Sequence, residues 1–457
     1  MLRSRDLLIT ATSRNVIHCI GACIFFQGIT GVIQDMSYRH IILIFAAMPI
    51  ALIGFGSAAH GQTDTLALSL GAARQIALTR SAVLAGDRYR LHAAEADTIG
   101  AHLYPNPELS VNAASYGVFQ KPIDNSQATT SYRIDQTIPI AGQRSNHILT
   151  ARESTEAARH TYDYQVFQTK AAVKDSYIDA AYAEINIGLA RQNYDLFAKL
   201  IEASKAQLHS GAIAEEDLTK LELTELTYRQ AVSDAEQSLM DAMNSLKQTM
   251  GFDTTAPIKV QYDFQSSGDL MPKDSLERVA YEQRADLSAS EHNVKAAEHQ
   301  SDLSRSNAWP APSFGIELDR NGPDFSNLYG GGIGISIPIF NRNQDDIYRS
   351  ESNERAAEYD YENARIGVHG DFNAAYEKYR NSLGVFRGLP PDIVKMATDV
   401  RDNALRNYTD GRIGLLDLLS SEQVYHDAIA SYYGSLYTLA KNESLLERAV
   451  GVEIFER

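Results

Sequence analysis

Cysteine is nearly absent from this chain of 457 residues. Its two cysteines, Cys19 and Cys23, both precede a stretch typical of an export signal, so the mature chain is expected to contain none. This excludes disulfides and thiolate catalysis together. It also leaves no acceptor for a lipid anchor at the mature N-terminus.

Basic residues are in the minority, because 42 lysines and arginines face 58 aspartates and glutamates, for a formal net charge of -16. Such a chain repels phosphate backbones, and no local cluster of basic residues offsets the repulsion, so no nucleic acid is expected as a partner. Hydrophobic residues make up 44% of the chain. That share is ample for a buried core and excludes disorder as the main state.

Motifs for catalysis and for metal binding are also lacking. The histidines are scattered singly, without the short spacing of a metal site. Met240, Met243 and Met250 share one helical face, where methionine usually fills space in a core. The glycine-rich segment 330–334 lacks the Lys-Ser/Thr pair of a phosphate-binding loop. We therefore expect no enzyme activity, no cofactor and no resident metal.

Residues 1–61 are expected to form a leader rather than part of the fold. From Met36 a short basic start precedes an apolar run, Ile41 to Phe55, and small residues follow around Ala59. This pattern is typical of a secretory signal peptide, and the run is too short for a membrane-spanning helix. Met36 is the simplest start of translation, and a genuine long leader is the alternative.

The rest of the chain contains one unit twice. Ala-Ala-Glu at 93–95 recurs at 296–298, and aromatic-Pro-x-Pro at 104–107 recurs at 309–312. Such self-similarity indicates an internal duplication, which decides the architecture. The expected parts are a first repeat over 62–250, an equatorial linker over 251–282 and a second repeat over 283–452.

Each repeat is expected to contain two strands, because apolar and polar residues alternate there with a period of two. The clearest case is Ile333, Ile335 and Ile337, which alternate with glycine and serine. Polar segments that begin at Gly117 and Arg320 are expected to be the loops between paired strands. The expected strands are 107–117 and 129–139 in the first repeat, and 313–320 and 331–339 in the second.

Very long helices are expected to follow each strand pair. Proline is absent from residues 141–256, and apolar residues recur there in steps of four and seven. This spacing predicts helices with a coiled-coil-like seam, the first of them about 100 Å long at 1.5 Å per residue. Pro390 and Pro391 are expected to interrupt the equivalent helix of the second repeat. The expected helices are 142–209 and 215–250, then 343–409 and 415–450.

Four strands with one apolar face have the pattern of a transmembrane barrel wall. Four strands cannot close a barrel, and open strand edges are not tolerated in hydrocarbon, so several chains would have to pool their strands. The alternative is a pair of soluble β-ribbons that cap a coiled-coil rod.

Several motifs together resemble the TolC-type outer-membrane efflux factors. They are Pro-Glu-Leu at 107–109, Ile-Pro-Ile-Phe-Asn-Arg-Asn-Gln at 337–344, and Tyr408-x-x-Gly411 followed by Asp-Leu-Leu at 417–419. The resemblance covers about residues 66–452. It implies a mainly α fold with a transmembrane β part: a trimeric twelve-stranded β-barrel in the outer membrane, continued by an α-helical barrel across the periplasm.

The resemblance also implies partners and a function. The homotrimer would contact outer-membrane lipid, dock to a periplasmic adaptor protein and serve an inner-membrane proton-driven pump or another exporter. The sequence of residues 337–344 most resembles that of the cobalt-zinc-cadmium resistance branch, so heavy-metal cations or small toxic compounds are the expected cargo. An exit duct for a protein or peptide secretion exporter, or a structural coiled-coil envelope protein, are the alternatives.

Candidate functional residues lie at the two helical turns. Asp417 matches the first of two aspartates that form the family's constriction, and the second position holds Ser420. In a trimer Asp417 would form an acidic ring that favours cations. Taken alone, an aspartate near the start of a helix is more often a stabiliser of the helix dipole.

In the family, contacts between the inner and outer helix pairs hold the closed state. Asp217 and Tyr408 match two of the residues involved, and Arg412 lies one place from the third. The alternative is that these are ordinary polar residues whose surface contacts are worth less than about 1 kcal/mol. The turns themselves are expected to dock the adaptor, and the residues assigned to them are Gly211, Leu218, Gly411 and Leu418.

Overall fold

The computed structural model describes residues 66–115, 128–211, 213–251, 258–262, 264, 272–321 and 326–455. The expected leader, 1–61, and most of the loop that begins at Gly117 lie outside these residues. The chain divides into two units, Met1–Gly61 and Gln62–Arg457. The fold described below is that of the second unit.

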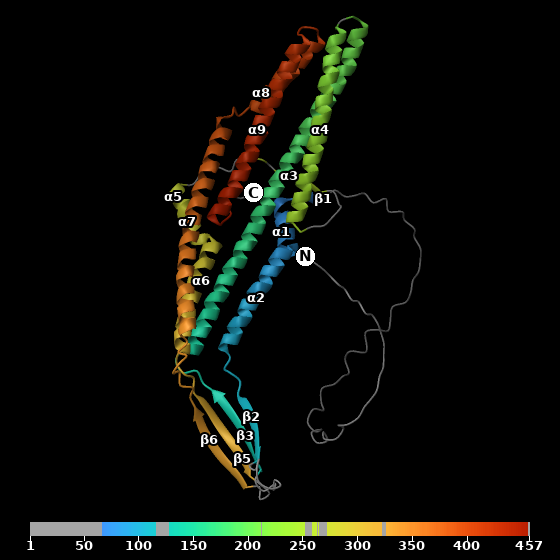
Figure 1. The fold of residues 1–457 in the computed structure, drawn as a ribbon. Coiled ribbons are helices and arrows are strands. Elements are labelled where there is room, and N and C mark those ends of the chain that lie inside the picture. Colours follow the sequence, from blue (N-terminus) through green and yellow to red (C-terminus); the bar gives the residue numbers. More distant parts are fainter. Residues whose placement is uncertain are drawn as a thin grey trace, which may run out of the picture. The chain divides into compact units, whose positions relative to one another are not determined.

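The first half of this unit consists of two short helices, a strand pair and two long helices (Figure 1). Its elements are β1 (Leu66–Leu68), α1 (Leu70–Arg80), α2 (Ala82–His102), β2 (Glu108–Ser115), β3 (Ala128–Thr137), α3 (Gln143–His209) and α4 (Glu215–Thr249). Ser81 begins α2 because its hydroxyl accepts a hydrogen bond from the Leu84 N–H at 3.3 Å, which satisfies one free donor of the first turn.

The second half repeats this order of elements. They are β4 (Ile258–Val260), α5 (Lys273–Gln283), α6 (Ala285–Asn307), β5 (Ser313–Asn321), β6 (Ser326–Gly334), α7 (Gln344–Gly388), α8 (Ile393–Thr409) and α9 (Leu415–Val450). The interruption expected near Pro390 separates α7 from α8. Leu389 adopts an extended conformation there, as a residue before proline usually does.

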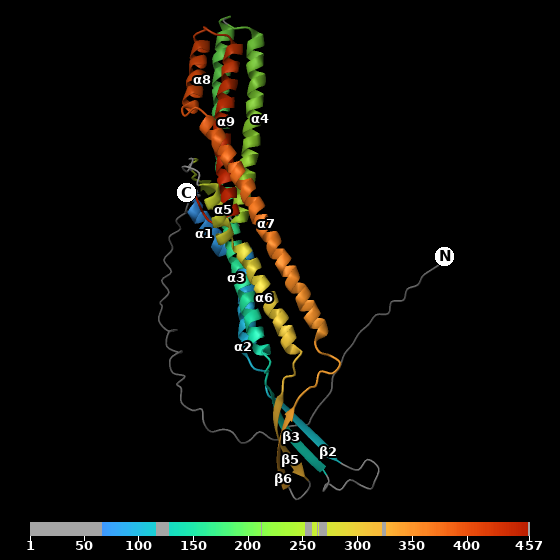
Figure 2. The ribbon, with the colours of Figure 1, turned by 90° about the vertical axis from the view of Figure 1, so that its left-hand side faces the viewer.

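The four longer strands form one antiparallel sheet in the order β2-β3-β5-β6. The central pair, β3 and β5, joins the two halves of the chain, with Ile134 opposite Ile316. The sheet lies beyond the ends of α2, α3, α6 and α7, and the turns α3–α4 and α8–α9 lie at the opposite ends of the helices (Figures 1 and 2).

The position expected for the fourth strand, 331–339, is wrong. β6 begins earlier, at Ser326, because β5 runs on to Asn321 and pairs with it directly across the hairpin. It ends at Gly334, whose partner Ser313 is the first residue of β5. Ile335 and Ile337 therefore continue the alternation of the sequence but lie outside the ladder.

The equatorial linker, 251–282, also contains regular structure. β4 pairs in parallel with β1, and α5 starts at Lys273, within the segment 251–282. Tyr177 of α3 binds β1 and the residue that follows β4, because its hydroxyl lies 2.6 Å from the Leu68 carbonyl oxygen and accepts from the Gln261 N–H at 2.9 Å.

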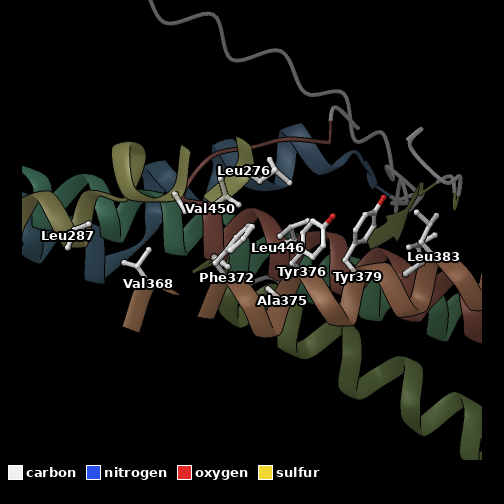
Figure 3. Packing of buried hydrophobic residues seen from close by; sticks show 13 residues of the cluster. Leu276, Leu287, Val368, Phe372, Ala375, Tyr376, Tyr379, Leu383, Leu446 and Val450 are labelled. Atoms are coloured by element: carbon white, nitrogen blue, oxygen red, sulfur yellow. The ribbon is translucent and has the colours of Figure 1, made fainter. Parts of the chain in front are cut away.

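Two equivalent cores stabilise the middle of the helical part. In the second half, buried side chains of α5, α6, α7 and α9 pack together, and Phe372, Tyr376 and Tyr379 of α7 line up along this core (Figure 3). In the first half, residues of α1, α3 and α4 pack against β1 and β4. A buried ion pair links the halves, with Lys174 Nζ of α3 2.6 Å from Glu447 Oε2 of α9.

Candidate functional site

The two helical turns are built alike. Gly211 follows α3 with φ +71°, and Gly411 follows α8 with φ +69°. A side chain at these left-handed positions would be strained, so glycine is the residue that lets each helix reverse. In each turn the glycine N–H donates to a carbonyl three residues back, Leu208 O and Tyr408 O respectively, at 2.9 Å.

A hydrophobic cluster brings the two turns together. It contains residues from α3, α4, α8 and α9, so both helical hairpins share one core close to their turns. Its buried members are Phe197, Leu200, Ile201, Leu221, Ala404, Tyr408, Leu415 and Leu418. A movement that separated the hairpins at this end would expose these side chains to water.

Asp417 is exposed in the first turn of α9. Its carboxylate accepts a hydrogen bond from the Gly414 N–H at 3.4 Å, so within one chain it caps the helix. Ser420, which stands at the second aspartate position of the family, is also exposed. The cap leaves the charge of Asp417 open to solvent.

Asp217, Tyr408 and Arg412 lie near the same end of the helices, but no hydrogen bond or ion pair among the described residues joins them. Arg412 pairs with Asp410 at 3.3 Å, and Asp217 lies 4.0 Å from Lys220. The Tyr408 hydroxyl is buried and has no hydrogen-bond partner within the described part of the chain.

The expectation for Leu418 needs a correction. Its side chain is 1% exposed and belongs to the shared cluster, and Leu218 packs against the same cluster. Leu418 therefore cannot touch a docked partner while the helices stay packed, because its apolar surface is already covered. Leu416, which is 80% exposed, is the leucine that faces outward in this turn.

Glu422, one turn further along α9, was not among the expected residues. It is 2% exposed, and neither of its carboxylate oxygens has a hydrogen-bond partner in the described residues. The signal was present in the sequence, because Leu418, Glu422, Tyr425 and Ile429 follow the four-three-four spacing of a buried helical stripe.

The structure also brings together two histidines whose pairing has no signal in the sequence. The rings of His160 and His292 stack with centroids 5.3 Å apart, and His292 Nδ1 lies 2.7 Å from Glu153 Oε2. Within the described ranges, no group of three or more His, Cys, Asp or Glu side chains is placed to hold a metal ion.

The sheet has two chemically different faces. The register places apolar residues of all four strands on one face, where they are exposed. These residues are Leu109, Val111, Tyr132, Ile134, Phe314, Ile316, Tyr329 and Ile333.

The opposite face of the sheet is mostly polar and charged, although Leu328 also lies on it. Arg133 donates to both Asp135 oxygens at 2.7 and 2.9 Å and contacts Glu317 at 3.5 Å. Gly315 on the adjacent strand β5 and Gly332 on β6 beyond it leave room for this guanidinium. Separately, none of the described helices combines the length and apolar character that a membrane crossing requires.

Comparison with known proteins agrees with this architecture. The family model described as outer membrane efflux protein matches residues 73–252 and 277–452. The chain belongs to this family. The two matched segments correspond to the two halves of the fold, and family membership makes the protein an efflux channel component of the outer membrane that extends into the periplasm.

Individual known proteins are similar to this chain at low sequence identity. The cobalt-zinc-cadmium resistance protein CzcC of Cupriavidus metallidurans is 22% identical over 384 residues, which cover 84% of this chain and 90% of CzcC. The crystal structure of CusC superposes with a TM-score of 0.71 at 16% identity, covering 85% of this chain and 94% of CusC. The outer membrane channel CmeC of Campylobacter jejuni gives a TM-score of 0.68 at 14% identity, with coverages of 85% and 87%.

Proposed function

We propose that three copies of this chain form the exit duct of a tripartite efflux assembly, with a periplasmic adaptor and an inner-membrane proton-driven pump as partners and metal cations as cargo. The observation that carries the proposal is the two-faced sheet. One chain supplies four strands with an exposed apolar face, while β2 and β6 at the edges have no partner strand within the described residues.

Closure of that sheet requires further copies. Unpaired backbone groups in hydrocarbon cost several kcal/mol each, so the free edges of β2 and β6 must be paired in a membrane. Pairing β6 of one copy with β2 of the next gives a ring of twelve strands from three copies. The apolar face then contacts lipid, and the face with Arg133 and Asp135 lines a wet lumen.

The charges of the lumen face favour cations as cargo. By register, the described strand residues of this face include Glu108, Asp135, Glu317 and Asp319 against a single base, Arg133. Three copies would multiply this acidic excess, and the acidic ring of Asp417 at the other end of the duct would add to it. A metal cargo also fits the name of the relative CzcC.

The helical turns are the proposed gate and docking surface. We infer that Gly211 and Gly411 present the tips to an adaptor, since both are exposed and a Cβ added at either would meet no neighbouring atom. Opening would separate the α3–α4 hairpin from the α8–α9 hairpin. Asp217, Tyr408 and Arg412 are then the polar groups available for contacts between copies at the gate.

The test is metal susceptibility of a deletion strain that carries the wild-type gene, Asp417→Asn or a control. Asp241→Asn is the matched control, because Asp241 is exposed on α4 and only bonds Gln237 at 2.8 Å. We expect wild type and control to restore zinc, cobalt and cadmium tolerance fully and Asp417→Asn to restore it partly. Metal thresholds unaffected by the deletion would refute the cargo, and equal rescue by all three genes would refute the acidic ring.

A further inference from the structure

Three glutamates of α9 occupy its buried stripe: Glu422, Glu443 and Glu447. Glu447 is well satisfied, because it pairs with Lys174 and its Oε1 accepts from the N–H groups of Ile454 and Phe455 at 3.2 and 2.9 Å. Glu422 differs, since burial deprives its carboxylate of water while no donor of the described residues lies within hydrogen-bonding distance to replace it. Burial of an ionised carboxylate without a hydrogen-bond donor is costly, and the cost is relieved if the group takes up a proton or moves to water.

The surroundings of Glu422 hold few charges. From α8, Arg401 and Asp402 act on it, but Arg401 is already engaged by Asp402 at 3.0 Å and by the Tyr425 ring at 4.3 Å. From α4 the phenol of Tyr228 faces it, and burial raises the pKa of that phenol to about 12, so it stays neutral.

One further titratable group lies nearby, a turn along α9. Burial lowers the pKa of His426, whose Nδ1 lies 3.4 Å from the Asn193 amide of α3 and whose Nε2 has no partner in the described residues. Asn193 is itself buried and uncharged. No described group around Glu422 thus supplies a free positive charge to hold its carboxylate in the ionised form.

We propose that Glu422 is a proton-responsive element at the turn end of the helices: protonated, it keeps α9 packed against α8 and α3, and ionised, it favours a loosened arrangement in which the carboxylate reaches water. The link to gating rests on the proposed function, because Glu422 lies one turn from Leu418 in the cluster that holds the two hairpins together. The packing response itself does not depend on cargo or partners.

The direction and size of the pH response follow from the linkage between proton binding by Glu422 and the packing of α9. Burial raises the pKa of Glu422 to about 6 from an ordinary value of 4.5, an effect that Asp402 strengthens and Arg401 opposes. The packed form therefore binds the proton more tightly and gains stability as the pH falls through 6 towards 4.5. From these two values, the opening equilibrium near Glu422 is expected to fall roughly eightfold between pH 7.5 and pH 5.0.

His426 acts in the opposite direction. Its neutral form is the one that suits burial, so its protonation in acid loosens the packing and offsets part of the Glu422 response. A His426→Gln variant removes this opposing effect and should show the full response. Glu422→Gln, which mimics the protonated carboxyl, should remove the response and raise protection at pH 7.5 by up to about 30-fold.

Hydrogen exchange of the assembled full-length protein in detergent tests the proposal. Peptides within 393–409 and 415–430 are followed from pH 5.0 to 7.5, with rates corrected for the intrinsic pH dependence of exchange. Glu222→Gln is the matched control, because Glu222 is exposed on α4 near the same turns. We expect protection of these peptides to rise in acid in the His426→Gln protein and in its combination with Glu222→Gln, but not in Glu422→Gln.

Each outcome bears on Glu422 directly. Two results would overturn the proposal. One is protection in the His426→Gln protein that does not change with pH, and the other is a pH response of Glu422→Gln equal to that of the wild type. Because the His426→Gln measurement leaves residue 422 intact, the proposal can be refuted whether or not Glu422→Gln folds. Failure of the proposed metal cargo would appear in the susceptibility test and would leave this local pH response in place.

Discussion

Removal of the Lys174 ammonium should weaken the middle of the helical part far more than removal of any surface cation. Lys174 Nζ and Glu447 Oε2 lie 2.6 Å apart, with side chains that are 2% and 4% exposed. Lys174→Met would leave the Glu447 carboxylate buried with only two backbone N–H donors. Breaking a buried ion pair on one side typically costs roughly 3–5 kcal/mol, because a charge stays buried without its counterion.

Lys170→Met is a close control on the same helix. Lys170 Nζ lies 3.4 Å from Glu453 Oε1, with side chains that are 35% and 41% exposed. Water screens such a pair, and its loss should cost less than about 1 kcal/mol. The double variant Lys174→Met with Glu447→Gln should recover most of the lost stability, because the amide oxygen still accepts from the backbone N–H groups while the buried charge is gone.

Native-state hydrogen exchange of α3 and α9 amides measures these differences as local free energies of opening. We expect a large loss in Lys174→Met, a small one in Lys170→Met and substantial recovery in the double variant. Equal, small losses in both single variants would show that the buried pair adds no more than a surface pair. A double variant as weak as Lys174→Met would show that lost packing, not the unpaired charge, is responsible.

Three further predictions concern a close approach in the sheet, a buried hydrogen bond and a helical turn. Gly315→Ala should impair trimer assembly on a heat-modifiability gel, since its Cβ would clash with Asp135 Oδ1, whereas Gly331→Ala, with only a 3.7 Å contact, should assemble normally. Tyr177→Phe should lower the local stability of the short β1–β4 sheet by about 1–3 kcal/mol, because buried backbone groups lose their partner; unchanged exchange there would contradict this. Gly411→Ala should cost about 1 kcal/mol through backbone strain alone, since nothing crowds that position, and thermal melting beside Gly411→Asn, which should be milder, measures it.

Periodicity along the chain was a good guide to the long elements. The period of two in the strands and the steps of four and seven in the helices reflect which face of each element is buried. A single chain already buries enough of each long helix to require apolar residues at this spacing. The fourth strand, predicted at 331–339, shows where periodicity fails as a guide. Ile335 and Ile337 keep the alternation, but β5 begins only after Pro312, so the ladder has no partner for them beyond Gly334.

Features that depend on contacts between distant segments were beyond the reach of the sequence. The pairing of β1 with β4, the stacking of His160 on His292 and the pairing of Lys174 with Glu447 each join residues from different halves of the chain. Neither residue of such a pair has a local signature. The turn residues were easier to locate because the glycines and Asp417 lie at fixed offsets from the helix ends, although the burial of Leu418 shows that location does not give exposure.

The pairing of β3 with β5 has a consequence for the order in which this protein can be made. Synthesis and export deliver β2 and β3 as a hairpin well before β5, since α3, α4, α5 and α6 come between them. Contacts so distant in sequence carry a large loop-closure entropy and form late. Until then the nascent chain exposes an apolar hairpin with two free edges, so the interval before β5 emerges is when aggregation threatens it most.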